Sequence, residues 1–444
     1  MDKILALAIF ILAIGVIIVA GSAGPLAVLF GSICAIIVVF FINKNFEGSE
    51  KIFLQRVFII SLVLRVGLAT VTYIFQLQEF FGGDSLTYDQ QGFDLYNSWF
   101  GYETQINADQ APTASGSGFG MAYIVAAIYS LVGRNPLATQ LFNSVLGAAT
   151  ACLIYVCAKK MFSNARVAKF SAVLVGVFPS LVLWSSQGLK DGIICFLLAS
   201  AINNVLALQK KISLVDVALL LISLIGIYTL RFYIFFAFAV AIVGAFFLGT
   251  QKTVGSIAKQ VLVLVVITLG LTYLGVLRNA QTNLEVYGNL EQLQRSREDL
   301  ARVGESRFGE DIDVSTPAGA LQALPLGLAY LMLAPFPWEV ANFRQAITLP
   351  EVFVWWTLIP FLIFGIWYAL KNKLRESLSV LLFTLLLTLS YSIFQGNVGT
   401  AYRMRSQMQI FYFIFVAVGL TLWQERRENQ NLVRKAQNQR MMRK

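Results

Sequence analysis

The acidic residues best placed for proton transfer come directly after an apolar segment. The chain has no histidine among its 444 residues, which excludes Ser–His–Asp catalysis and leaves acid–base chemistry to Asp, Glu, Lys or Tyr. The stretch 81–89 reads PheGlyGlyAspSerLeuThrTyrAsp, and its glycines allow a tight turn. A carboxylate at such a turn can deprotonate a hydroxyl or bind a divalent cation such as Mg²⁺ or Mn²⁺. Asp84 and Asp89 are the candidates, although Asp89, like Asp94, fits a solvated acidic loop better.

A further acidic residue, Asp191, lies between two apolar runs. It occurs in the stretch 186–192, SerGlnGlyLeuLysAspGly, where Lys190 precedes it. The pair suits a reaction at a membrane surface. The stretch equally suits a polar hairpin tip in which Asp191 caps a helix. The residues themselves leave these two interpretations open.

Arginines at the ends of apolar runs indicate an anion site. Arg231 separates two such runs, and Arg403 and Arg405 lie together in a short stretch between two others. A guanidinium group donates two parallel hydrogen bonds to phosphate, so these residues suit a lipid substrate with a phosphate head. Neither Arg231 nor Arg403 has an acidic neighbour in sequence. Arg134 and Arg344 occupy comparable places, and ion pairing between loops is the alternative explanation for such residues.

Composition identifies the elements that carry these residues as membrane helices. The chain is 57% hydrophobic and 13% charged, whereas a soluble domain is about 25% charged. The net charge of +10 does not indicate nucleic acid, because Lys and Arg cluster in short loops and at the C-terminus. A spanning helix needs about 20 apolar residues. Runs of this kind cover residues 4–20, 25–42, 53–75, 136–158, 167–185, 192–208, 214–230, 232–248, 257–277, 352–370, 378–394 and 408–423.

The positive loops determine the orientation of these runs. If every loop rich in Lys and Arg is cytoplasmic, an even number of crossings separates each successive pair. The apolar runs 119–132 and 318–335 then cannot cross, and they lie at the outer interface. The sequence therefore predicts an all-α integral membrane protein with about twelve transmembrane helices and both termini cytoplasmic. Its outer loops are at about 76–136, 278–351 and 395–407, and its polar tail is expected to fray.

The order of these features resembles the multi-spanning glycosyltransferases of the C-fold class (GT-C). A spanning run with an internal arginine, Arg65, precedes an outer loop that opens GlyAspSerXaaXaaTyr. A short non-spanning helix follows, then a run ending LysLysMetPhe and another ending PheProSerLeuValLeuTrpSerSer. The resemblance extends from Gln55 to Trp423 and is to the protein-mannosyltransferase-like group (family 39). Arg65 itself is either a substrate contact or a structural residue.

The resemblance implies which residues carry the reaction. In that class an Asp of the first outer loop activates the acceptor, and Asp84 matches that residue. A second acid lies in the next outer loop, and Asp191 matches its position. Donors are sugars on polyprenyl phosphate, held by basic residues at the outer face. The predicted substrate-binding residues are Tyr88, Lys190, Arg231, Arg344, Arg403 and Arg405. The stretch 114–121, AlaSerGlySerGlyPheGlyMet, lacks the His–Pro or Lys–Pro–Pro of many relatives, so the acceptor stays open among lipid, glycan and protein.

The sequence therefore predicts an inverting glycosyltransferase of a bacterial plasma membrane, with its active site on the periplasmic face. Residues 1–52 form two additional N-terminal helices, 53–424 the catalytic core and 425–444 a basic cytoplasmic tail. A polysaccharide polymerase or ligase with lipid-linked donors is the alternative enzyme. The alternative from a different class of protein is a transporter or flippase of lipid-linked glycans. Such a protein is expected to have charged or broken helices at mid-membrane, often in two related halves.

Overall fold

The chain folds almost entirely into helices. A computed structural model describes residues 3–81, 83–102, 119–248, 254–303, 306–309 and 311–442. Within these ranges the only pairing of extended segments is an isolated bridge between Arg307 and Asn397. The predicted all-α class is therefore confirmed for the described part of the chain. Residues 103–118 of the first predicted outer loop lie outside it.

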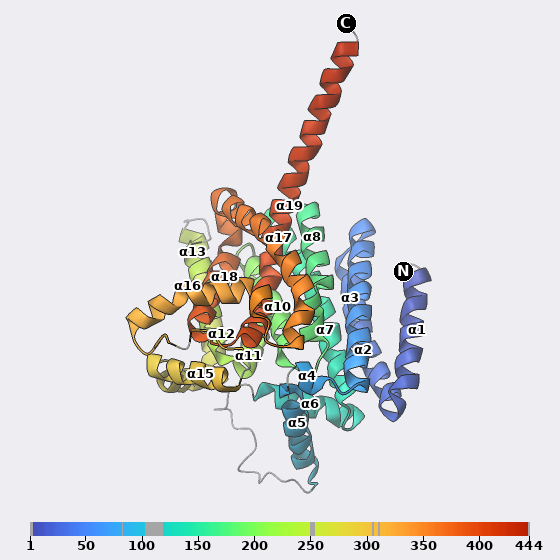
Figure 1. Ribbon diagram of the computed structural model, residues 1–444, viewed down its shortest axis with the longest axis vertical. Coiled ribbons are helices and arrows are strands. Elements are labelled where there is room, and N and C mark those ends of the chain that lie inside the picture. The colour runs from blue at the N-terminus through green and yellow to red at the C-terminus, as the bar shows by residue number, and fades with distance from the viewer. Residues whose placement is uncertain are drawn as a thin grey trace.

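Figure 1 shows how the helices are arranged. The first ones along the chain are α1 (Lys3–Val19), η1 (Gly21–Ala23), α2 (Gly24–Asn45), α3 (Gly48–Ile74), α4 (Gln78–Phe81), α5 (Asp84–Phe100), α6 (Gly120–Val132), α7 (Pro136–Phe162), α8 (Ala165–Val177), α9 (Pro179–Ser185) and α10 (Lys190–Leu208). They are followed by α11 (Leu214–Leu230), α12 (Phe232–Leu248), α13 (Val254–Tyr273), α14 (Val276–Tyr287), α15 (Leu290–Val303), α16 (Pro317–Leu333), η3 (Pro337–Glu339), α17 (Phe343–Asn372), α18 (Leu374–Phe394) and α19 (Val398–Met442).

Seven of the described helices are long and apolar enough to cross a membrane. They are Gly21–Asn45, Gly48–Ile74, Pro136–Phe162, Lys190–Leu208, Phe343–Asn372, Leu374–Phe394 and Val398–Gln439. Two bent pairs, Ala165–Val177 with Pro179–Ser185 and Ile257–Tyr273 with Val276–Glu285, raise the number to nine if each pair is one span. The chain is thus an integral membrane protein with seven to nine candidate spans in its described part, which does not show the predicted number of about twelve. The remaining predicted crossings coincide with shorter apolar helices, Leu7–Val19, Leu214–Leu230 and Phe232–Phe247.

Ion pairs join several of the predicted cytoplasmic loops at one end of the bundle. Lys159 near the end of α7 pairs with Glu50 at the start of α3, with an N–O distance of 2.6 Å. Arg166 at the start of α8 pairs with Glu428 of α19 at 3.1 Å. Helices α4, α5 and α6 lie at the opposite end, away from the free part of α19 (Figure 1). The two ends of the bundle therefore carry different sets of loops.

Arg65 of α3 holds the bend between α8 and α9. Pro179 begins α9 and has no N–H, so the carbonyl of Val175, four residues earlier, loses its helical donor. Arg65 is buried and donates to the carbonyls of Gly176 at 2.7 Å and Val175 at 3.3 Å. Its Nε also donates to Ser185 Oγ at 2.7 Å, at the end of α9. These bonds support the structural interpretation of Arg65, which stabilises a bend of 57° in a membrane-embedded segment.

The C-terminal tail is helical, and the expected fraying is not seen up to Met442. It forms the end of α19, a single helix of 45 residues that extends beyond the bundle (Figure 1). After Leu420 this segment contains neither Gly nor Pro, and many of its residues are strong helix formers. The guanidinium of Arg427 also lies 3.8 Å from the ring centroid of Trp423. Local helix propensity accounts for the difference from the predicted fraying.

Candidate active site

A helix inside the first predicted outer loop presents Asp84. Helix α5 begins at Asp84, and Gly83 precedes it in the N-cap position. The partial positive charge at the start of a helix favours a carboxylate there. The Asp84 side chain is 53% exposed, so it is accessible to a substrate.

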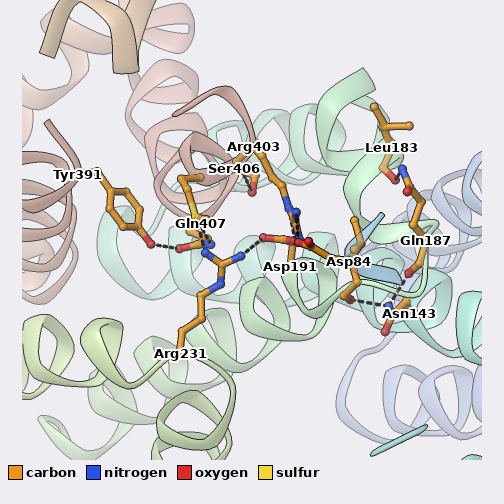
Figure 2. A network of polar contacts seen from close by, with 12 residues as sticks. Asp84, Asn143, Leu183, Gln187, Asp191, Arg231, Tyr391, Arg403, Ser406 and Gln407 are labelled. Atoms are coloured by element: carbon orange, nitrogen blue, oxygen red, sulfur yellow. Dashed lines mark hydrogen bonds and ion pairs between the residues drawn. The ribbon is translucent and has the colours of Figure 1, made fainter. Parts of the chain in front are cut away.

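Asp84 belongs to a chain of alternating charges (Figure 2). Arg403 donates from Nη1 to Asp84 Oδ2 at 2.7 Å, and from Nε to Asp191 Oδ2 at 2.7 Å. Arg231 donates from Nη2 to the other oxygen of Asp191, Oδ1, at 2.7 Å. The order is therefore Asp84, Arg403, Asp191, Arg231. Segments far apart in the sequence meet in this chain of charges.

Asp191 is the buried centre of the chain. It lies in the first turn of α10, and its side chain is 0% exposed. Both of its oxygens accept hydrogen bonds from arginine, as a buried carboxylate requires. The loop that precedes it is held by Asn143 of α7, whose Nδ2 donates to the carbonyls of Gln187 and Leu189 at 2.6 and 2.7 Å. The geometry places Asp191 between two guanidinium groups, beside an internal cavity of only about 20 Å³.

The two arginines approach Asp191 from different helices. Arg231 occupies the break between α11 and α12 and is buried, and its Nη1 also donates to the Tyr233 hydroxyl at 2.8 Å. Its Nε has no hydrogen-bond partner among the described residues. Arg403 lies near the start of α19 and is 12% exposed, with its guanidinium carbon 5.7 Å from the centroid of the Trp184 ring. Arg403 is thus the arginine with access to the solvent side of the site.

A cavity of about 580 Å³, here called the cationic cavity, adjoins this chain of charges. The predicted site residues that line it are Asp84, Tyr88, Lys190, Arg231, Arg344 and Arg403. One carboxylate therefore faces four cations in the lining, which favours an anionic ligand. The volume lies in the range of small-ligand sites, roughly 300–1,000 Å³.

Lys190, Tyr88 and Arg344 form further parts of the wall. Lys190 Nζ lies 5.5 Å from the centroid of the Tyr88 ring. Burial raises the pKa of Tyr88 to about 12, and the negative charge of Asp84 adds to the effect. The Tyr88 hydroxyl is therefore protonated at neutral pH and can donate a hydrogen bond. Arg344 Nη1 donates to the carbonyl of Phe80 at 3.2 Å, which ties α17 to α4.

Arg405 is not among the residues that line the cationic cavity. Its side chain is buried, and Nη1 donates to the carbonyls of Met332 and Ala334, both at 3.1 Å. Trp355 Nε1 donates to the same Met332 carbonyl at 2.6 Å. These bonds satisfy carbonyls that the end of α16 leaves without helical donors. They fix the segment that leads into Pro335, which lines the cavity.

The two aspartates considered for a metal site lie on different sides of α5. Asp89 accepts hydrogen bonds from Arg134 Nη2 at 2.7 Å and from the Tyr129 hydroxyl, and it does not line the cationic cavity. The hydrogen bond to Asp89 raises the pKa of Arg134. Within the described ranges no three His, Cys, Asp or Glu side chains gather as a group of metal ligands. Asp84 and Asp89 therefore do not fit a shared divalent-cation site.

Several side chains that the sequence analysis did not select complete the site. Asn143 fixes the loop before Asp191, and Trp184 and Tyr402 form an aromatic wall with ring centroids 6.3 Å apart. Gln407 accepts a hydrogen bond from the Tyr391 hydroxyl at 2.5 Å (Figure 2). Asn143 and Gln407 are polar residues inside or beside apolar runs, where such side chains need protein partners. Their position in or beside apolar runs was the one signal in the sequence that could have identified them as residues with buried protein partners.

Comparisons with known proteins bear on the fold. No protein-family model and no curated protein matches the sequence. The archaeal oligosaccharyltransferase AglB from Archaeoglobus fulgidus, solved with an inhibitory peptide and a dolichol-phosphate, matches with a TM-score of 0.52 and 15% identity, over 88% of this chain and 52% of that chain. The Archaeoglobus fulgidus oligosaccharyltransferase in the apo form matches with a TM-score of 0.52 and 14% identity, over 86% of this chain and 52% of that chain.

The described helices thus share the fold of these oligosaccharyltransferases, which have the GT-C architecture of the predicted resemblance, and at 14–15% identity the likeness concerns the fold alone. The chain spans about half the length of these oligosaccharyltransferases. The comparison does not distinguish the protein-mannosyltransferase-like group from other members of the class.

Proposed function

We propose that the chain is a membrane glycosyltransferase that moves a sugar from a polyprenyl-phosphate donor to an acceptor on the non-cytoplasmic face. The observation that carries the proposal is the cationic cavity, which joins the half-exposed Asp84 to Arg231, Arg403 and Lys190. The reaction requires a carboxylate that an acceptor can reach and cations that can bind a phosphate. The similar structure that holds a dolichol-phosphate and an inhibitory peptide supports a lipid-linked donor and a separate acceptor.

The proposed chemistry is a single displacement. The oxygen of the acceptor hydroxyl forms a bond to the anomeric carbon while the bond from that carbon to the phosphate oxygen breaks. Asp84 accepts the hydroxyl proton, and the electron pair of the broken bond leaves on the phosphate. Attack opposite the leaving group inverts the configuration at the anomeric carbon. A positioned base of this kind contributes ~100- to 10,000-fold to the rate.

Arg403 links the donor to the base in this proposal. Its guanidinium is shared between Asp84 and Asp191. A donor phosphate that binds Arg403 competes with Asp84 for the guanidinium, so donor binding frees the carboxylate to accept the acceptor proton. Arg231 and Lys190 offset the charge that develops on the leaving phosphate.

Asp191 and Arg405 are positioning residues in this proposal. The sequence suggested a catalytic role for Asp191, but its two oxygens bind arginine and its side chain is 0% exposed, so we propose that it orients Arg231 and Arg403. Arg405 was predicted to bind substrate, and its bonds to the end of α16 favour a role in shaping the cavity wall. Tyr88 and Arg344 stay substrate-binding candidates because they line the cationic cavity.

We extend the proposal to the topology. If each of the two bent pairs is one span and the shorter helices Leu7–Val19, Leu214–Leu230 and Phe232–Phe247 also cross, the chain has about twelve crossings with both termini cytoplasmic. The catalytic core is then 53–424, preceded by two additional helices in 1–52 and followed by a cytoplasmic tail of 425–444. The location of the site at the end opposite the ion pairs of Lys159 and Arg166 supports this orientation. A bacterial plasma membrane and the protein-mannosyltransferase-like group belong to the same proposal.

Sugar transfer by the purified protein in lipid nanodiscs tests the proposal. The donors are a panel of polyprenyl-phosphate hexoses and pentoses, and the acceptors are a membrane extract from cells that lack the protein. We expect Asp84→Asn to lose transfer by ~100-fold or more at normal expression, because the variant keeps the shape and loses the base. Asp94→Asn is the matched control, since Asp94 lies on the same helix and does not line the cavity.

Two results would contradict the proposal. An Asp84→Asn variant that keeps more than about a tenth of the activity shows that Asp84 is not the base. A flippase would give no transfer with the wild-type protein under any donor.

A further inference from the structure

A second cavity lies on the other side of α5. It has a volume of about 570 Å³ and is lined by residues from the ends of α1 and α3 and from α4, α5, α6 and α7. Asp84 and Tyr88 line the cationic cavity, whereas Ser85 and Asp89, each one residue further along, line the second. Successive residues of an α-helix point about 100° apart, so one helix can serve two cavities. The proposed reaction gives the second cavity no role.

Buried polar atoms without partners line this second cavity. Gln140 is 2% exposed and Ser85 is 7% exposed, and neither Gln140 Oε1 nor Ser85 Oγ has a hydrogen-bond partner in the described part of the chain. A polar atom removed from water needs a partner. An amide oxygen only accepts hydrogen bonds, so a ligand that satisfies Gln140 must donate one. A serine hydroxyl both donates and accepts, and its natural complement is another hydroxyl.

The carboxylate of Asp89 adds further acceptors to the same wall. Arg134 Nη2 and the Tyr129 hydroxyl hold it in place, with the Arg134 bond at 2.7 Å. Its side chain is 15% exposed, so part of it is accessible to a ligand in the cavity. Asp89 and Gln140 together require a ligand with more than one donor group.

The charges of the two cavities differ. Four cations line the cationic cavity, whereas the described lining of the second contains neither Lys nor Arg and includes the carboxylates of Asp89 and Glu79. The negative potential of the second cavity would repel a phosphate group, whereas it would not repel neutral hydroxyl groups. Arg134 balances Asp89 from outside the lining. The second cavity therefore suits a neutral, polyhydroxylated ligand of small-molecule size.

We propose that the second cavity binds a neutral saccharide unit. Saccharide hydroxyls donate to Gln140 Oε1 and to Asp89 and exchange hydrogen bonds with Ser85. Val19 at the end of α1 forms part of the wall, which gives the additional N-terminal helices a function in binding. The binding inference stands on this cavity alone. That the saccharide belongs to the acceptor rests on the proposed function.

Saturation-transfer difference NMR on the full chain in deuterated detergent tests the binding. The probes are methyl glycosides of neutral hexoses and pentoses, with methyl phosphate as a competitor. We expect saturation transfer to at least one glycoside, and methyl phosphate should not displace it because phosphate binds the cationic cavity. Gln140→Met and Ser85→Ala should each weaken glycoside binding by roughly 3- to 10-fold, since each removes one hydrogen bond.

Two controls separate this inference from a general loss of structure and from the proposed function. Gln409→Met replaces another buried glutamine, which lines neither cavity, and should bind the glycoside as the wild type does. Asp84→Asn should lose sugar transfer while it keeps glycoside binding. The inference is overturned if no glycoside receives saturation from the wild-type protein, if methyl phosphate displaces the glycoside, or if Gln140→Met and Ser85→Ala both bind like Gln409→Met.

Discussion

Replacement of Arg403 by alanine should weaken donor binding without preventing folding. Arg403 is 12% exposed, lines the cationic cavity and binds both Asp84 and Asp191. In Arg403→Ala the buried Asp191 loses the partner of Oδ2 but keeps the bond from Arg231 to Oδ1, so its charge stays paired, and the smaller alanine side chain leaves room for water at Oδ2. We therefore expect near-normal expression of the variant and a specific loss of donor affinity.

The size of that loss follows from the contacts of Arg403. A charged hydrogen bond to the phosphate contributes about 1.5–3 kcal/mol. Part of this is offset because the phosphate displaces Asp84, and an ion pair as exposed as this one contributes about 0.2–1 kcal/mol. The net loss is then about 1–2 kcal/mol, or roughly 5- to 30-fold in the donor KM. Arg403→Lys should rescue this only partly, because lysine keeps the charge and lacks the planar fork.

The assay is the rate of sugar transfer against the concentration of the lipid donor in nanodiscs. Arg134→Ala is the matched control, because Arg134 pairs with Asp89 and does not line the cationic cavity, and its donor KM should equal that of the wild type. An unchanged donor KM in Arg403→Ala would refute the placement of the phosphate in this cavity. It would leave Arg403 as a structural partner of Asp191 alone.

Arg405→Met should lower the stability of the protein by about 2–4 kcal/mol without a change in the donor KM, because the carbonyls of Met332 and Ala334 lose a charged donor. A melting curve like that of the wild type, or a raised donor KM, would argue against this structural role. For the topology, a cysteine introduced at Ser306, which lines the cationic cavity, should react with a membrane-impermeant thiol reagent in intact cells, and one at Ser213 should not. Labelling at Ser213 alone would invert the orientation and place the site on the cytoplasmic side.

The apolar runs predicted the membrane helices closely, because a bilayer imposes a long apolar stretch on each. The predicted run 136–158 corresponds to α7 (Pro136–Phe162), and 192–208 to α10 (Lys190–Leu208). Helix α5 was not predicted, because it lacks such a stretch. It packs closely on α6, where a Cβ added at Gly92 would lie 2.3 Å from Val125 Cγ1. A helix that depends on tertiary contacts of this kind is difficult to predict from the hydrophobic pattern of a single sequence.

The proximity of four candidate residues could be predicted from the sequence, but their contacts could not. Positive loops and chemistry placed Asp84, Asp191, Arg231 and Arg403 at one membrane face, and the structure brings all four into one chain of charges. No ion pair was predicted for either Arg231 or Arg403, because no acid lies near either in sequence. In the structure both bind Asp191, which is 40 residues from Arg231 and 212 from Arg403. Pairing over such separations depends on how α10, α19 and the break between α11 and α12 pack together, which one sequence does not specify.

The lipid-linked sugars of a strain that lacks this protein test the central claim most directly. Mass spectrometry of its membrane lipids should show that a polyprenyl-phosphate sugar accumulates, because the enzyme that consumes the donor is absent. Expression of the wild-type chain should return the pool to its normal level, and expression of Asp84→Asn at the same level should not. An unchanged pool of polyprenyl-phosphate sugars in the deletion strain, or full restoration by Asp84→Asn, would contradict the account.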